Sequence, residues 1–168
     1  MKYFALLISI IFSFNVAANT VAEGYNAVKN GNYKKGFDIL LPLADSGDPD
    51  AQYGVGILFK EGWGTNKNVQ KAYEYYQKAA VKGNVGAMFD IGYSYQTGDS
   101  GSKDYKKAAE WFEKAAEKGH PLAMYGLGGL YFNGLGVSKD IEIAKKWYQK
   151  SAELGYQPAA TFIKQYLQ

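Results

Sequence analysis

The chain has 168 residues, of which 47% are hydrophobic and 21% are charged, and these proportions are typical of a soluble globular protein with a folded core. The formal net charge is only +3 and every basic residue is lysine, which argues against nucleic-acid binding because arginine is the side chain that reads phosphate and guanine by paired hydrogen bonds. Cysteine is absent, which excludes disulfides, thiolate metal sites, a cysteine nucleophile and a lipid-modified cysteine.

Residues 1–18 are predicted to form a cleavable signal peptide. One basic residue precedes an apolar run from Phe4 to Phe14, and small residues follow it. We expect cleavage after Ala18, with Ala17 or Ala22 as alternative sites. The run is shorter than the ~20 apolar residues that span a bilayer, so no stable membrane insertion is expected after cleavage, and an uncleaved anchor is the alternative. The leader therefore predicts a periplasmic or secreted protein.

A repeat of 36 residues organises the rest of the chain. The same interval separates Ala51, Ala87, Ala123 and Ala159, and it also separates Gly47, Gly83, Gly119 and Gly155. A fixed interval of this length is the signature of a repeat protein. The predicted organisation is a degenerate hairpin over residues 19–47, repeats over 48–83, 84–119 and 120–155, and a capping helix over 156–168.

The predicted elements are all helices, taken here in chain order. Residues 19–47 indicate one helix, a turn at Asn30 and Gly31, and a second helix. Each repeat then has apolar residues at helical spacing in two stretches, separated by a glycine at position 62, 98 or 134. In the last helix we expect four residues to cover the final hairpin: Phe162, Ile163, Tyr166 and Leu167.

Polar residues mark where the predicted helices begin, and glycines mark where they end. We expect Asp48, Asn84 and His120 to open the first helix of each repeat. Four residues that share one repeat position are expected to open the second helices through their side chains: Asn32, Asn68, Asp104 and Asp140. Three glycines are expected to end the second helices in a left-handed conformation: Gly83, Gly119 and Gly155.

Helices of about a dozen residues are marginal alone in water, so these hairpins must be stabilised by packing on one another. Small residues leave room for close approach of the helices, while tyrosine and tryptophan fill the wider gaps. The small residues are Ala79, Ala80, Ala115, Ala116, Gly56, Gly92 and Gly128. Stacked hairpins of this kind form a quasi-linear solenoid with one broad surface.

The unit DPDAQYGVGILFKEGWGTNKNVQKAYEYYQKAAVKG and its two partners resemble the Sel-one-like repeat, a relative of the tetratricopeptide repeat. The shared elements are an alanine followed four residues later by an aliphatic residue and glycine, the Gly-x-Gly turn at Gly62 and Gly64, and the ending in Lys-(Ala/Ser)-Ala-x-x-Gly. The middle repeat departs, because Ser100 stands where the others have glycine. The resemblance implies an all-α, right-handed α-solenoid whose first helices line the concave side and hold proteins together.

The candidate partner-binding residues are first-helix positions that point away from the apolar stripe. Their chemistry differs between repeats, as in a tailored contact surface, although an ordinary solvated face would show the same variation. The apolar anchors among them would be Ile57, Tyr93 and Phe132, since aromatic and aliphatic groups dominate interface energetics. The seven candidates are Ile57, Lys60, Asp90, Tyr93, Gln96, Phe132 and Asn133.

Other motifs favour structural roles. His120 is the only histidine, which excludes a histidine metal cluster or a Ser-His-Asp triad and favours a role in opening a helix. The glycine pairs continue into no phosphate-binding loop, so no nucleotide or other cofactor is expected. Most aromatic residues lie on the packing stripe, which favours core filling over a stacking surface for nucleic acid or sugar.

Two functions are carried forward from the sequence. The favoured one is a non-catalytic scaffold, expected to be monomeric, that binds a protein or peptide ligand on its concave face. The alternative is a penicillin-binding or β-lactamase-like cell-wall enzyme, motivated by the Ser-x-x-Lys spacing of Ser100 and Lys103. Neither Ser-Asp-Asn nor Lys-Thr-Gly accompanies that pair, and about one such pair is expected by chance in this composition.

Overall fold

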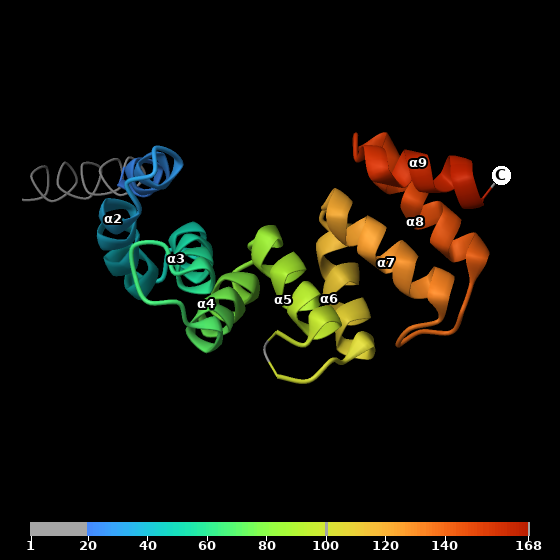
Figure 1. The fold of residues 1–168 in the computed structure, drawn as a ribbon, viewed down its shortest axis with the longest axis horizontal. Helices are drawn as coiled ribbons and strands as arrows, with labels where there is room; N and C mark the ends of the chain where they lie inside the picture. The colour runs from blue at the N-terminus through green and yellow to red at the C-terminus, as the bar shows by residue number, and fades with distance from the viewer. Residues whose placement is uncertain (1–19, 100, 168) are drawn as a thin grey trace, which may run out of the picture. The chain divides into compact units, whose positions relative to one another are not determined.

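The computed structural model describes residues 20–99 and 101–167, and every regular element within these ranges is an α-helix (Figure 1). The predicted signal peptide lies outside the described residues. The chain divides into two compact units, the first ending at Lys82 and the second beginning at Gly83. The helical hairpins predicted from the sequence are therefore present in both units.

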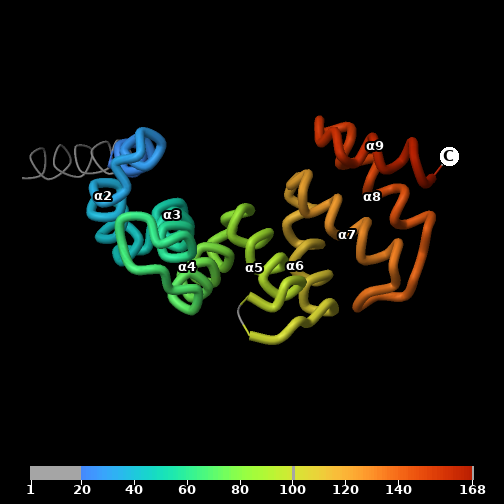
Figure 2. The backbone as a smooth tube through the Cα atoms, in the orientation of Figure 1, coloured from blue at the N-terminus to red at the C-terminus, as the bar shows by residue number. Residues whose placement is uncertain are grey.

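The first unit contains a helix over residues 20–29 and then α2 (Tyr33–Ser46), α3 (Pro49–Glu61) and α4 (Val69–Val81). Consecutive helices pack on each other, α2 on α3 and α3 on α4, as the backbone path in Figure 2 shows. The turn expected after the first helix is confirmed at residues 30–31.

The second unit contains α5 (Val85–Thr97), α6 (Tyr105–Glu117), α7 (Pro121–Asn133), α8 (Ile141–Glu153) and α9 (Gln157–Tyr166). Each helix packs on the next one along the chain. The core of the unit is formed by alanines and large side chains of both helices of each hairpin, including Ile91, Phe112, Leu127 and Tyr148.

Side-chain hydrogen bonds open most helices as the sequence predicts. The carboxylate of Asp48 accepts from the Ala51 N–H at 2.8 Å, and Asn68, Asn84, Asp104 and Asp140 make the same bond three residues ahead at 2.8–3.0 Å. The hydrogen bond from the Lys107 N–H lowers the pKa of Asp104 below its ordinary value, because it favours the charged carboxylate.

The expectation for Asn32 was wrong, since its side chain makes no capping hydrogen bond at the start of α2. Its backbone ψ is 58°, whereas the residues that cap α4, α6 and α8 have ψ between 92° and 108°. The side chain of Asn32 instead lines the cleft described below.

The glycines after the helices have the predicted left-handed conformation. Gly83, Gly119 and Gly155 have φ of 93°, 86° and 87°. Position 136 also requires glycine, because an added Cβ there would lie 2.2 Å from the Tyr105 carbonyl carbon. Ser100, the departure of the middle repeat, lies outside the described residues.

A glycine on each first helix faces an aromatic ring of the second helix in the same hairpin. An added Cβ would lie 2.5 Å from Tyr76 at Gly56 and 2.7 Å from Phe112 at Gly92, and 3.1 Å from Tyr148 at Gly128. The three rings are almost completely buried. The sequence predicts that these glycines allow close helix approach, and the structure shows that the group they accommodate is chiefly the ring.

Helix α9 packs on α8, with Ala159 and Leu167 buried and Phe162 and Ile163 partly buried, and its role as a cap stays a prediction. The expectation for Tyr166 was wrong, because this side chain is 57% exposed. Lys164 occupies in α9 the repeat position of Gly56, Gly92 and Gly128, 36 residues after the last of them. Helix α9 therefore lacks the glycine that accommodates a ring in the other hairpins.

Hydrogen bonds also tie neighbouring hairpins together. In the first unit the Tyr25 hydroxyl donates to the Asp50 carbonyl at 2.6 Å, and the Tyr75 hydroxyl donates to the Asp45 carboxylate at 2.8 Å. Burial and these negative neighbours raise the pKa of both tyrosines to about 12. Both hydroxyls therefore remain donors at neutral pH.

Candidate binding surfaces

The predicted contact residues lie on the first helices of the repeats. Ile57 and Lys60 are partly buried on α3 in the first unit. On α5 of the second unit, Asp90 and Gln96 are partly buried, and Tyr93 is 41% exposed with its ring 6.1 Å from that of Phe89. Tyr93 is the one large apolar side chain of the predicted set that is prominently exposed, and its role in binding stays a prediction.

The two candidates on α7 make contacts within the second unit. The Phe132 ring lies 5.2 Å from the Phe162 ring in an edge-to-face arrangement and packs on the core cluster that holds Tyr148. The Asn133 amide donates to the Gly129 carbonyl at 2.9 Å. Phe132 thus helps attach α9, so a binding test that replaces it would also disturb the cap.

His120 opens α7 as predicted, and its ring is partly buried. Its Nδ1 accepts from the Ala123 N–H at 3.3 Å, and its ring stacks on Phe89 with the centroids 4.7 Å apart. Burial lowers the pKa of His120 below its ordinary value because it disfavours the charged ring, and the Asp90 carboxylate partly opposes this.

This geometry predicts that acid weakens the start of α7. The folded state binds a proton at His120 less readily than the unfolded chain, so stability is fully present above pH ~6.5, falls as the pH drops below that value and levels off below the folded-state pKa. Urea midpoints measured between pH 7.5 and 5 should therefore decrease less for His120→Asn, which caps without titrating, than for the parent protein. Equal pH profiles for the two proteins would remove His120 from this explanation.

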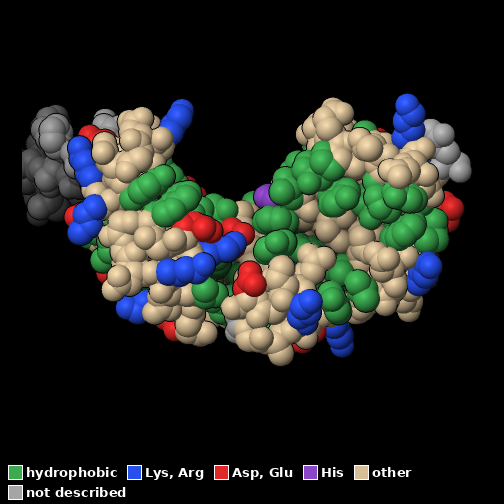
Figure 3. Space-filling model, viewed as in Figure 1, with side chains coloured by type: hydrophobic (Ala, Val, Ile, Leu, Met, Phe, Trp, Pro, Cys, Tyr) green, Lys and Arg blue, Asp and Glu red, His purple; other side chains and the backbone are tan. Residues whose placement is uncertain are grey.

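A groove with a volume of about 480 Å³ runs between α7 and α9 in the second unit. Tyr125 lines it from α7, and α9 contributes the rings of Phe162 and Tyr166 and the amides of Gln157 and Gln165. Pro158 and Thr161 complete the lining. Hydrophobic side chains are gathered over α7 to α9 on the face that Figure 3 shows.

The aromatic walls of this groove are held in place by the core. The Tyr125 ring lies 5.2 Å from both the Tyr148 and the Tyr156 rings, in edge-to-face contacts. Burial, with a smaller contribution from Tyr156, raises the pKa of Tyr125 above its ordinary value. The Tyr125 hydroxyl is therefore protonated at neutral pH and can donate a hydrogen bond.

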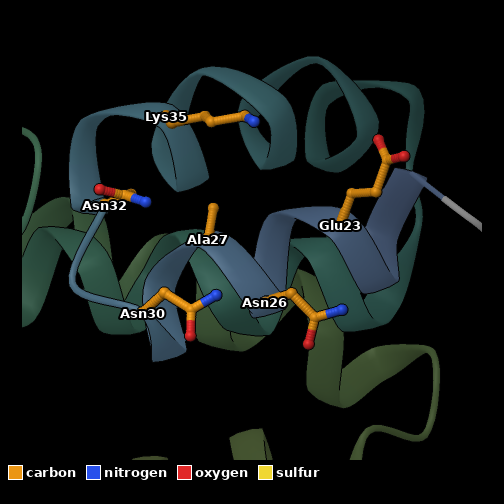
Figure 4. Close-up of a pocket in the computed structure, with 6 residues that line it drawn as sticks. All are labelled: Glu23, Asn26, Ala27, Asn30, Asn32 and Lys35. Atoms are coloured by element: carbon orange, nitrogen blue, oxygen red, sulfur yellow. The ribbon is translucent and has the colours of Figure 1, made fainter.

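A second, polar cleft of about 290 Å³ lies between the helix over residues 20–29 and α2. Figure 4 shows Ala27 on its floor, Asn30 and Asn32 at the end formed by the turn, and Glu23 at the opposite end. Asn26 and Lys35 complete the lining, and the polar groups are spread along the cleft. This arrangement offers hydrogen bonds to solvent or ligand but converges on no single point.

Sequence reasoning named few residues of either depression. It assigned Phe162 and Tyr166 to packing, Asn30 to a turn and Asn32 to a cap. Both depressions form where two helices meet, so their residues follow no helical stripe of their own. The repeat periodicity predicts that Tyr166 is buried, because Leu130 at the same repeat position is fully buried. The exposure of Tyr166 in the structure departs from this periodicity.

Within the described parts of the chain, no group of three or more histidine, aspartate and glutamate side chains is arranged to hold a metal ion. In the same residues no helix is both long and apolar enough to cross a bilayer. Ser100 is outside the described residues, so the structure does not place the Ser100–Lys103 pair, and the catalytic alternative stays a hypothesis.

The Sel1 repeat family model matches residues 49–84, 85–120 and 121–156, which together make up most of the chain. Each matched repeat begins one residue later than the corresponding unit defined from the sequence. The chain is a Sel1-repeat protein. This confirms the predicted family and the predicted fold class, an all-α solenoid of antiparallel helical hairpins. Sel1 repeats generally mediate protein–protein interaction.

Solved structures agree with this assignment. A Sel1 repeat protein from Oxalobacter formigenes is 33% identical with a TM-score of 0.80, over 87% of this chain and 60% of that one. A protective antigen of uropathogenic Escherichia coli with an SLR fold is 29% identical with a TM-score of 0.80, over 88% of this chain and 32% of that one. This Sel1-repeat protein thus spans less than two thirds of either structure. No curated protein matches its sequence significantly.

Proposed function

We propose that this Sel1-repeat protein is a non-catalytic scaffold that binds a protein or peptide through its first helices, as a monomer, in the periplasm or outside the cell. The observation that carries the proposal is the exposure of Tyr93 on α5, within a repeat whose other large hydrophobic side chains are all at least partly buried. The membership of the chain in a family of interaction scaffolds supports it. The leader-like residues 1–18 support the location.

Tyr93 has the properties of an interface anchor. The equivalent residues in the other two repeats are Ile57 and Gly129. The side chain at this position therefore varies in size from glycine to tyrosine, while the apolar character of the buried stripe is the same in all three repeats. An exposed tyrosine buries a large area on binding and loses little rotational freedom, which is why tyrosine is enriched at hot spots. The first helices therefore offer different side chains to a partner on a constant framework.

A photo-crosslinking amino acid placed at position 93 in the native host tests this proposal. We expect it to trap one protein partner in the fraction released from the periplasm or in the medium, on a chain that begins at Asn19. With the purified partner, Tyr93→Ala should weaken binding at least about tenfold, which corresponds to ~1.4 kcal/mol. Helical content should be unchanged.

Leu154→Ala is the matched control, because Leu154 is 52% exposed in the same unit and follows the second helix α8. It should change the affinity for the partner by less than about twofold, as surface truncations outside an interface do. A crosslinked partner whose affinity falls equally with Tyr93→Ala and Leu154→Ala, or the absence of any specific crosslink at position 93, would contradict the proposal.

A further inference from the structure

We infer that the groove between α7 and α9 binds a proline-rich segment in the polyproline II conformation. The inference deepens the proposed function and rests on it, because α7 is a first helix and α9 continues the register of first helices, with Ala159 at the repeat position of Ala123. A partner held by the first helices would reach this groove within the second unit. The chemistry of the lining selects the kind of segment.

The rings of the groove are already positioned for stacking. Tyr125 is fixed by its contacts with Tyr148 and Tyr156, and Tyr166 lies 4.8 Å from Phe162 while remaining 57% exposed. Aromatic-lined grooves take proline rings on their faces, and a preformed polyproline II helix loses little conformational entropy when it docks. Both partners are thus ordered before they meet.

The polar groups of the lining match the backbone of such a segment. Proline has no N–H, so a proline-rich segment presents carbonyl acceptors that need donors. The side-chain amides of Gln157 and Gln165 and the hydroxyls of Tyr125 and Tyr166 are the donors carried by the residues that line the groove. The Thr161 hydroxyl already donates to the Gln157 carbonyl at 3.1 Å. The amides and the tyrosine hydroxyls are therefore the groups that would donate to the carbonyls of the segment.

The charge of the groove also fits this occupant. No lysine, aspartate or glutamate is among its seven lining residues, so a charged segment would lose its hydration without gaining a counter-ion. A neutral saccharide would meet the same rings, and the side-chain oxygens of Gln157 and Gln165 could accept from its hydroxyls, but Sel1 repeats generally mediate protein–protein interaction. A neutral, proline-rich peptide is thus the occupant that the lining favours.

Titration of the ¹⁵N-labelled protein with decaproline tests the inference. We expect saturable shifts of the side-chain amide signals of Gln157 and Gln165. Tyr166→Ala should weaken the binding about tenfold, because it removes one ring face, whereas Tyr166→Phe keeps the ring and should bind within about threefold of the parent. Leu154→Ala, outside the groove, should bind decaproline like the parent protein. Because Tyr166 is largely exposed, we expect these variants to fold like the parent, and circular dichroism checks this.

Three results would overturn the inference. These are the absence of saturable shifts with decaproline, equal binding by Tyr166→Ala and the parent, and saturation of the same signals by an N-acetylglucosamine tetramer when decaproline has no effect. Failure with decaproline while the crosslink at position 93 persists removes only the groove assignment. Binding of decaproline without a crosslink at position 93 instead contradicts the proposed contact through Tyr93.

Discussion

Phe112→Ala is expected to destabilise the second unit by ~3–5 kcal/mol, the usual cost of removing a fully buried phenylalanine. The Phe112 ring is 1% exposed, lies 5.7 Å from the Phe89 ring and fills the space left by Gly92. Truncation leaves a cavity between α5, α6 and α7, and Gly92 and Gly126, which face the ring, have no side chains to fill it. Urea unfolding followed by circular dichroism measures the loss.

Glu113→Ala provides the control for Phe112→Ala, because Glu113 is the next residue of α6 and is exposed. Its substitution should change the free energy of unfolding by less than ~0.5 kcal/mol. Amide exchange should show where the loss occurs, with the amides of α5, α6 and α7 losing the most protection, because these helices contact the ring and repeat proteins transmit stability chiefly between neighbours. A loss below ~1 kcal/mol for Phe112→Ala would show that the ring is not packed as described.

Gly92→Ala is expected to destabilise the protein by ~1–3 kcal/mol, the usual cost of overpacking a core. In an exposed helix interior the same change stabilises by ~1 kcal/mol, because alanine is the better helix former. At Gly92 the added Cβ would lie 2.7 Å from Cδ1 of Phe112 and 3.3 Å from the Ala108 carbonyl oxygen. The clash therefore reverses the sign of the propensity effect.

Gly129→Ala tests this reasoning with the opposite outcome. Gly129 lies inside α7, and an added Cβ would meet only the Tyr148 hydroxyl oxygen at 3.6 Å, an ordinary van der Waals distance. We expect Gly129→Ala to raise the thermal midpoint slightly and Gly92→Ala to lower it. If both variants move the midpoint in the same direction, the ring does not determine which residue is tolerated at position 92.

The periodic features of the fold could be predicted because each depends on a few neighbouring residues. Asp48 and Asn84 cap helices through the N–H three residues ahead, and Gly83 and Gly119 end helices through their own backbone conformation. Such local interactions recur wherever the local sequence recurs. A 36-residue interval therefore carries the element order without any knowledge of the tertiary contacts.

The features that depend on contacts between distant residues could not be predicted in this way. Asn32 keeps the repeat position of the capping residues, but its backbone ψ differs from theirs and its side chain makes no capping hydrogen bond. Phe132 is predicted to be an exposed anchor because it lies on a first helix. Its side chain instead packs against Phe162, 30 residues later. The groove that Tyr125 and Tyr166 line arises from the approach of α7 and α9, which no single periodicity encodes.

Lys164 restricts where further repeats can be added to this protein by design. A further 36-residue unit joined after α9 would bring its own aromatic residue against the lysine side chain, at the position where Gly56, Gly92 and Gly128 accommodate such residues. New units should instead be inserted ahead of residue 157, so that α9 still follows the last of them. A chain extended after α9 would need glycine in place of Lys164 before the added hairpin could dock.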